Sequence, residues 1–411
     1  MRLAFLTHEP FYPPSGGGSA EAVYLVRELV GRGHEVHIFG PPSVEPARVE
    51  QEFGVQLHPF TQWQMGRYTP WRNLKYLLYP SALCRLVEPV ARIRTFDLLL
   101  SQHAISAVAA GRLGCRLKMP VVMNFLDHLS GFMETWPVWL MPPPVLAVLK
   151  RYELSVPRRF AAAGVLTVSD TLADLFAQAG YRRERLLPIY YGYDSRLFAL
   201  DERAVKARTD QPPTIVMHGS LDHHHLLNIA LGAVERVVAE RPDAIFKFVG
   251  QRTGALEGFL RRVRRRVPSA RLDCTGFVPY GDVANLLSTA SVGIVPYEES
   301  TGTHCAFVAK TVEYLGLGLP VVSTPLDSGR RYFSNERLVR FSRFDGSDFG
   351  ENILAWLREP LERRNGLAAA ASARVRAELD WSVICAKAAA FVEDALARHQ
   401  AQRGAVRLDA N

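Results

Sequence analysis

The N-terminal half of the chain alternates short apolar runs with longer segments in which apolar residues recur every three or four positions. Residues 2–8 form the first apolar run, and a loop rich in proline and glycine follows. From Ser19 a helical pattern places Ala22, Val26 and Leu29 on one face. Further apolar runs occupy residues 35–39, 97–101, 120–125 and 164–168. Short apolar strands that alternate with helices predict a doubly wound parallel sheet.

This alternation breaks between residues 187 and 213, where a turn-like stretch precedes a charged segment that ends in Gln211-Pro212-Pro213. We expect the domain boundary there. A second series of strands is predicted at residues 214–218, 244–249, 271–274, 292–296 and 320–323. The sequence therefore predicts an α/β protein with domains at residues 1–200 and 201–380. A last amphipathic helix, beginning at Trp381 within residues 381–411, is expected to pack back on the first domain.

The composition is that of a soluble globular protein: of 411 residues, 48% are hydrophobic and 22% are charged, which excludes a disordered or fibrous chain. The net charge is +8, but only seven of the 49 cations are lysines. Arginine usage explains this balance better than a nucleic-acid partner does, although a basic surface also suits an anionic ligand or membrane. Five scattered cysteines without a CxxC pair favour reduced thiols in the cytoplasm. Neither a signal-peptide core nor about 18 consecutive apolar residues occur, so we expect a soluble protein.

A glycine-rich loop, Ser15-Gly16-Gly17-Gly18-Ser19, separates the first predicted strand from the first helix. Backbone amides at such a position can approach a phosphate or a sugar closely. The spacing is not the G-x-G-x-x-G of a dinucleotide site. A flexible turn explains three glycines equally well.

The segment 297–324 carries the second candidate site. A helix predicted to begin near Phe307 places Lys310 and Glu313 three positions apart on one face. A nucleotide diphosphate could lie over the first amides of this helix, with Lys310 adding positive charge and Glu313 accepting ribose hydroxyls. The alternative is an ordinary ion pair on the surface of a helix.

The run from Lys310 to Val322 resembles the "K-x-x-E-Y-L-A-x-G-x-P-V-V" segment of retaining glycosyltransferases of group 1, or family 4-like enzymes, which have the GT-B fold. Other stretches resemble the same family in the same order. These are residues 16–36, similar to its "G-G … L-x-x-x-G-H-x-V" start, residues 170–198, similar to its "S-x-x-L … N-G-V-D … F" segment, and residues 248–297, similar to its "V-G … G-x-x-P" core.

The resemblance implies two Rossmann-like domains that face a central cleft, with the acceptor bound by the first and the nucleotide-sugar donor by the second. It also implies retention at the anomeric carbon, no metal and no cofactor beyond the donor as substrate. Lys310 and the adjacent helix N-terminus would stabilise the negative charge that grows on the leaving diphosphate. The donor-binding residues implied are Gly17, Gly18, Gly219, Val308, Ala309, Lys310, Thr311 and Glu313.

The sequence departs from the family pattern at two places. Many relatives carry a glutamate eight positions before the one matched by Glu313, where this chain has Cys305. Many also carry Arg and Lys after the first strand of the second domain, where this chain has residues 218–226 without a cation of either type. A subgroup of capsule, exopolysaccharide and teichuronic-acid-type transferases lacks both features, and this sequence resembles that subgroup best.

A polar stretch at the carboxyl end of the predicted strand 120–125 supplies candidate catalytic residues in the first domain. It resembles the subgroup's "y-D-x-x-D-d-x-x-x-F" segment. Asp127 would act on the acceptor hydroxyl as base or orienting group, and His128 would contact the sugar or share the proton. The alternative for Asp127 is helix capping. Asn124 stands where the subgroup has an acidic residue, which weakens a paired-carboxylate mechanism.

Three further patterns in the sequence have a plain structural interpretation beside a functional one. His223, His224 and His225 point about 100° apart in a helix and so cannot all face one metal ion. The arginine-rich run 261–266 is interpreted as a solvated helix face. Six aromatic residues lie near cations in the first domain and indicate an anionic membrane surface, with burial in the core as the alternative. They are Trp63, Trp71, Tyr76, Tyr79, Trp136 and Trp139, and the cations are Arg67, Arg72, Lys75, Lys150, Arg151, Arg158 and Arg159.

The predicted function is transfer of a sugar from a UDP- or GDP-type donor to a glycan or lipid-linked acceptor in cell-surface polysaccharide biosynthesis. The protein is expected in the cytoplasm, with peripheral association to the inner face of the cell membrane. Two alternatives stay open: a catalytically silent subunit that binds a nucleotide sugar, motivated by Cys305, and a nucleotide-sugar epimerase on the same fold.

Overall fold

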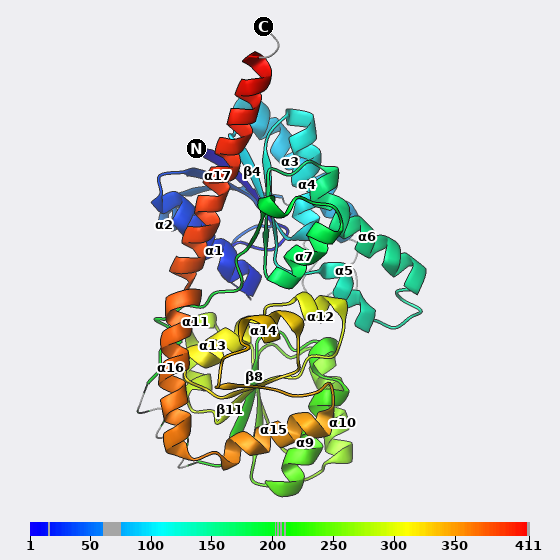
Figure 1. The fold of residues 1–411 in the computed structure, drawn as a ribbon, viewed down its shortest axis with the longest axis vertical. Coiled ribbons are helices and arrows are strands. Elements are labelled where there is room, and N and C mark those ends of the chain that lie inside the picture. The colour runs from blue at the N-terminus through cyan, green and yellow to red at the C-terminus, as the bar shows by residue number, and fades with distance from the viewer. Residues whose placement is uncertain are drawn as a thin grey trace. The chain divides into compact units, whose positions relative to one another are not determined.

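The computed structural model describes residues 1–14, 17–60, 75–201, 203, 205, 208 and 211–408, without the side chains of residues 17, 75–77 and 404–408. The chain forms two compact units, whose elements are labelled in Figure 1. Unit 1 comprises Met1–Ser130, Val138–Tyr190 and Ser382–Asn411, and unit 2 comprises Gly131–Pro137 and Tyr191–Trp381. The short segment Gly131–Pro137 therefore belongs to unit 2, although it lies within the N-terminal half of the sequence.

Unit 1 is built on a seven-stranded sheet in the order β3-β2-β1-β4-β5-β6-β7, in which every neighbouring pair is parallel. Its strands are β1 (Arg2–Leu6), β2 (Glu35–Gly40), β3 (Val55–Pro59), β4 (Leu98–Gln102), β5 (Val121–Phe125), β6 (Gly164–Thr167) and β7 (Leu186–Pro188). All residues of β4 and β5 are buried, as expected for strands covered on both faces.

Helices connect these strands. They are α1 (Gly17–Gly31), α2 (Pro46–Phe53), α3 (Lys75–Ile93), α4 (His103–Leu117), α5 (Leu129–Phe132), α6 (Pro143–Arg159) and α7 (Asp170–Gln178). The last helix, α17 (Trp381–Leu408), packs on this unit from Ser382 onward. Within it, Glu393 pairs with Arg32 Nη1 at 3.0 Å and with His34 Nε2 at 2.8 Å.

Unit 2 contains a six-stranded sheet in the order β10-β9-β8-β11-β12-β13, again parallel throughout. Its strands are β8 (Thr214–His218), β9 (Ile245–Val249), β10 (Arg271–Gly276), β11 (Val292–Val295), β12 (Val321–Ser323) and β13 (Val339–Phe341). Its helices are α9 (Asn228–Glu240), α10 (Gly254–Arg266), α11 (Tyr280–Ser288), α12 (Thr301–Cys305), α13 (Ala309–Gly316), α14 (Asp327–Tyr332), α15 (Gly346–Arg358) and α16 (Leu361–Leu379).

The strand orders confirm the predicted α/β class with two doubly wound parallel sheets. In each sheet the chain winds outward in one direction and then reverses, between β1 and β4 in unit 1 and between β8 and β11 in unit 2. Doubly wound sheets bind ligands at the carboxyl ends of the strands on either side of this reversal. We therefore expect the ligand-binding residues in the loops that follow β1, β4, β8 and β11.

Candidate active site

Lys310 lies at the reversal point of unit 2, at the start of α13. Its side chain is buried, with 7% of the residue exposed, and Nζ donates a hydrogen bond to Tyr297 Oη at 3.2 Å. Tyr297 follows β11, and Lys310 lies further along the same connection between β11 and β12, so this hydrogen bond joins two parts of one connection. Gly219, directly after β8, has φ +88°, and a Cβ built there would lie 3.4 Å from Lys310 Cε. This left-handed conformation favours glycine and keeps side-chain bulk away from the ammonium group.

Glu313 lies one turn further along α13 and is also buried, with 6% exposed. Its Oε2 is 2.5 Å from Nε2 of His218, the last residue of β8, and its Oε1 accepts a hydrogen bond from Tyr280 Oη at 3.0 Å. Both charged residues of α13 are thus inside the unit and have separate partners. The alternative of an exposed ion pair between Lys310 and Glu313 is wrong.

The N-terminus of α13 provides backbone donors beside Lys310. Val308, the N-cap residue, has extended backbone angles and forms no side-chain cap hydrogen bond. The helix begins at Ala309 rather than near Phe307, and the shorter helix α12 precedes it at Thr301–Cys305. The first amides of α13 and the Lys310 ammonium group together form a positive site with the chemistry required for a diphosphate. Ala309 and Thr311 belong to this turn.

Cys305 is completely buried at the end of α12, at the position where many relatives carry a glutamate. Two glutamates precede it in the sequence and have other partners. Glu298 Oε1 accepts the amides of Asn228 and Ile229 at 2.8 and 3.1 Å and so caps α9, and Glu299 Oε1 lies 3.5 Å from His304 Nε2.

The three consecutive histidines form a short 3-10 helix, His223–His225. His225 is buried, accepts the Asp222 amide at its Nδ1 at 3.2 Å, and its ring lies 4.2 Å from that of Tyr297. The ring therefore supports the tyrosine that holds Lys310. Within the described ranges, no group of three or more potential metal-ligating side chains lies together, and metal independence stays a prediction.

In unit 1 the reversal point contains a buried polar cluster that begins with Glu21 of α1. The Glu21 carboxylate accepts hydrogen bonds from Gln102 Nε2 at 2.5 Å and from Asn124 Nδ2 at 2.8 Å. Gln102 also donates to the carbonyl oxygen of Gly18 at 2.8 Å. Burial raises the pKa of Glu21 to about 7, against the lowering effect of its amide partners. The cluster joins the start of α1 to the ends of β4 and β5.

His103 lies beside this cluster and was not predicted as a site residue. It is the first residue of α4, with φ +66°, and its Nε2 is 3.7 Å from Glu9 Oε2. Burial lowers the pKa of His103, but Glu9, Asp127 and Glu21 outweigh it and raise the pKa above its ordinary value. A Cβ built on Gly18 would lie 3.0 Å from Nε2. A non-glycine residue in the left-handed region is uncommon, and here it directly follows β4, one of the two strands at the reversal point.

The structure places Asp127 and His128 directly after β5, but in different surroundings. Asp127 is partly exposed and lies close enough to His103 to raise its pKa. His128 is fully buried, and its Nδ1 is 3.2 Å from Glu153 Oε2. Burial alone would raise the pKa of Glu153, but His128 and Ser130 outweigh it and hold the pKa below its ordinary value. The His128 ring therefore lies in the interior of unit 1, and its contact with the sugar stays a prediction.

The glycine-rich loop is partly described. Ser15 and Gly16 lie outside the described residues, and Gly17 is the first residue of α1. Gly18 is the glycine with a defined environment, between the Gln102 amide and the His103 ring. Its lack of a side chain therefore has a steric reason as well as the proposed functional one.

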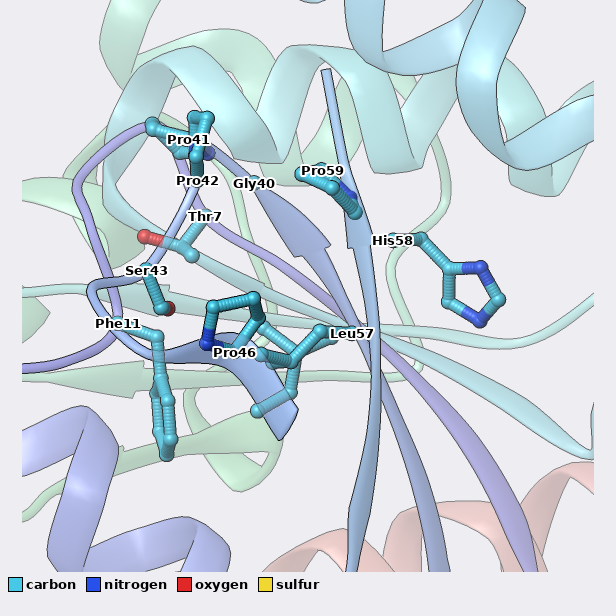
Figure 2. Close-up of a pocket in the computed structure, with 11 residues that line it drawn as sticks. Thr7, Phe11, Gly40, Pro41, Pro42, Ser43, Pro46, Leu57, His58 and Pro59 are labelled. Atoms are coloured by element: carbon cyan, nitrogen blue, oxygen red, sulfur yellow. The ribbon is translucent and has the colours of Figure 1, made fainter. Parts of the chain in front are cut away.

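A small apolar hollow lies elsewhere in unit 1, beside the ends of β1, β2 and β3. Figure 2 shows Phe11, Pro46 and Leu57 pointing into it, whereas the His58 ring lies on the other side of β3. His58 stacks on Phe39 at 4.4 Å. None of the predicted site residues lines this hollow, and we assign it no catalytic role.

Two family models match the chain and together cover most of it. Residues 15–197 match Glycosyltransferase Family 4, and residues 212–359 match Glycosyl transferases group 1. No significant match was found among curated proteins.

Several solved structures share the fold. Anabaena Alr3699/HepE in complex with UDP and glucose matches with 17% identity and a TM-score of 0.72, covering 96% of this chain and 99% of that chain. Sucrose-phosphate synthase from Thermosynechococcus elongatus matches with 15% identity and a TM-score of 0.77, covering 97% and 99%. A glycosyltransferase from Rickettsia africae matches with 13% identity and a TM-score of 0.69, covering 96% and 98%. At these identities the likeness establishes the fold alone.

Proposed function

Since the chain is a glycosyltransferase of group 1 with the GT-B fold, we propose that it moves a sugar from a UDP- or GDP-type donor to a glycan or lipid-linked acceptor. The proposed reaction retains the anomeric configuration and uses no metal. Its proposed setting is cell-surface polysaccharide biosynthesis at the inner face of the cell membrane. A UDP donor is supported by the Anabaena neighbour, which was solved with UDP and glucose.

The observation that carries this proposal is the buried Lys310 at the N-terminus of α13. As the bond between the anomeric carbon and the diphosphate oxygen breaks, negative charge grows on that oxygen. Fixed donors in a site with little water stabilise such charge more effectively than the same groups in water. Lys310 and the first amides of α13 supply these donors, while Glu313, held by His218 and Tyr280, accepts the ribose hydroxyls.

Unit 1 supplies the proposed acceptor residues. Asp127 is partly exposed and orients the acceptor hydroxyl or receives its proton. His103 stands nearby, with a pKa raised by Glu9, Asp127 and Glu21, and assists as a proton carrier. The resemblance to the family motif supports the role of Asp127. The position of His103 directly after β4 and beside Glu9 supports its role.

Lys310→Ala tests the proposal. We expect purified protein to release nucleotide diphosphate from its donor, and kcat to fall about 100- to 1000-fold in Lys310→Ala, the usual effect of losing one donor to a developing oxyanion. Lys247→Ala is the matched control, because Lys247 lies in β9 of the same sheet and pairs with Asp273 at 3.4 Å. Equal activity of the two variants would refute the assigned role of Lys310.

The donor itself is identified by thermal-shift screening against UDP-, GDP- and ADP-sugars. A bound donor raises the melting temperature by mass action, and Glu313→Ala is expected to abolish the shift if Glu313 holds the ribose. Lys247→Ala again serves as the control.

The catalytically silent subunit stays as the second candidate, because Cys305 occupies the place of the family's first glutamate. It predicts nucleotide-sugar binding without turnover in the presence of any acceptor. Detectable donor hydrolysis or transfer that depends on Lys310 would exclude it. The comparisons do not favour the epimerase, because both family models describe transferases.

The proposed membrane setting is one of peripheral association. In the part of the chain that the structure describes, no helix has the length and apolar character needed to cross a bilayer. In the proposed setting, unit 1 reaches a lipid-linked acceptor at the membrane surface.

A further inference from the structure

The loop before α6 and the first half of that helix expose a concentration of apolar side chains. Of the eleven large hydrophobic side chains exposed in the described part of the chain, six fall between Val138 and Tyr152, and Trp139 is 82% exposed. We call these six residues the apolar tip: Val138, Trp139, Leu140, Val145, Val148 and Tyr152. Large apolar patches on a soluble domain usually mark an interaction site.

The apolar tip is held on a defined support. Pro142 is the N-cap residue of α6 and prolines occupy the first positions of the helix, which fixes the backbone there. The buried residues of α6 lie in its second half, at Glu153, Val156 and Pro157, where the helix packs against α4 and α7. Within unit 1, the first half of α6 extends away from the sheet (Figure 1).

The exposed charges of α6 are of one sign. The charged residues that α6 places outside the core are Lys150, Arg151, Arg158 and Arg159. Its one anion, Glu153, is buried and accepts the amides of Leu129 and Ser130 at 2.8 Å. The surface therefore combines an exposed tryptophan and aliphatic residues with cations. That is the composition found where proteins meet the interface of an anionic bilayer.

The structure also corrects the membrane-facing group expected from the sequence. Tyr79 is 2% exposed and belongs to the core of unit 1, so burial accounts for it. Trp63, Trp71, Arg67 and Arg72 lie outside the described residues, as do the side chains of Lys75 and Tyr76. Trp136 is half-buried and belongs to unit 2. Among the aromatic members whose side chains the structure describes, Trp139 is strongly exposed.

We propose that the apolar tip and the cations of α6 dock this protein on an anionic phospholipid bilayer. Trp139 and its apolar neighbours enter the interfacial region, and Lys150 and Arg151 contact lipid phosphates. The inference rests on the proposed function only for the use of this docking, which is to bring unit 1 to a lipid-linked acceptor. The binding itself requires no donor and no turnover.

Co-sedimentation with vesicles tests the proposal. Full-length protein is mixed with vesicles of phosphatidylcholine alone or of phosphatidylcholine with 30% phosphatidylglycerol. We expect binding to the anionic vesicles only, weakening as salt screens the charges. The double variant Trp139→Ser/Val148→Ser should lose about tenfold or more in affinity. Lys150→Gln/Arg151→Gln should lose about 25-fold, at about fivefold for each cation.

Matched controls distinguish binding through the apolar tip and the cations of α6 from nonspecific binding through other exposed residues. Ile93→Ser removes another strongly exposed apolar residue of unit 1, which is 85% exposed at the end of α3. Arg264→Gln/Arg265→Gln removes two exposed cations of α10. Both controls should bind vesicles like the unaltered protein. Circular dichroism and melting temperature verify that every variant is folded.

The outcomes are decisive in both directions. No binding of the unaltered protein to anionic vesicles, or equal binding by the apolar-tip variant, would overturn the proposal. A dimer in light scattering that becomes a monomer in Trp139→Ser/Val148→Ser, without vesicle binding, would instead assign the apolar tip to self-association. Donor hydrolysis, measured on the same samples, should be unchanged in these variants. If donor hydrolysis is absent from every sample while vesicle binding is intact, the result contradicts the proposed transferase activity and leaves the docking proposal standing.

Discussion

Replacing Glu21 by glutamine should change how the stability of unit 1 depends on pH. Glu21 is buried between Gln102 and Asn124, and burial raises its pKa from 4.5 to about 7. In the unfolded chain the carboxyl group ionises near 4.5, whereas in the folded unit it keeps its proton to about pH 7. Between these values the folded state binds more protons, so stability falls as pH rises.

The size of this effect follows from the pKa change. One pKa unit corresponds to about 1.36 kcal/mol, so the full change in the free energy of unfolding is about 3 kcal/mol. Between pH 5 and pH 8 about 2 to 3 kcal/mol of it should be visible. Glutamine carries no charge at any pH. The stability of Glu21→Gln relative to the unaltered protein should therefore improve by this amount from pH 5 to pH 8, whatever the difference is at pH 5.

Hydrogen exchange is the suitable assay, because the chain has two units that need not unfold together. Peptides that span β4 and β5 report the opening of unit 1. Comparing the two proteins at the same pH cancels the intrinsic dependence of exchange on pH. Glu28→Gln, a substitution at a partly exposed position of the same helix, serves as the control and should show no such trend. A constant difference between Glu21→Gln and the unaltered protein, within about 0.5 kcal/mol from pH 5 to pH 8, would refute the reasoning.

Three further predictions concern packing and catalysis. Gly293→Ala places a Cβ 2.5 Å from the Tyr314 ring and should destabilise unit 2 by about 1 to 3 kcal/mol; Gly281→Ala, with nothing within 4 Å, is the control in urea titrations. Tyr314→Phe removes the buried hydrogen bond to the Val216 carbonyl, 3.2 Å long, and should cost about 1 kcal/mol in the same titrations. His103→Ala should slow transfer to the acceptor at least about 100-fold while leaving the thermal shift with donor unchanged; an equal loss of donor binding would contradict its placement on the acceptor side.

The sequence predicted most of the fold because the strands at both reversal points are continuous apolar runs. The expected strands at 35–39, 97–101, 120–125 and 292–296 correspond to β2, β4, β5 and β11. The strands that were missed, β3, β7 and β13, lie at sheet edges and have partly exposed side chains. A half-exposed run of three to five residues has no periodicity that separates it from a loop.

The candidate site was predictable only in part. The spacing of Lys310 and Glu313 on one helix is local, and the structure places both at the reversal point of unit 2. Their partners His218, Tyr280 and Tyr297 come from other loops, and only the fold brings them together. His103 had one local signal, a polar residue directly after a buried strand. Its positive φ and its proximity to Glu9 are properties of the folded chain.

The division of the chain has a practical consequence for dissecting this protein. Unit 1 is assembled from three separate stretches, and its last helix follows the whole of unit 2. A fragment that stops at residue 190 would lack α17, leaving Arg32 and His34 without Glu393. A fragment of residues 191–381 would lack the stretch Gly131–Pro137, whose Glu134 accepts the Thr301 hydroxyl at 2.9 Å. No single cut yields either half intact, so assigning activities to the halves requires point substitutions, or co-expressed complementary pieces that reassociate.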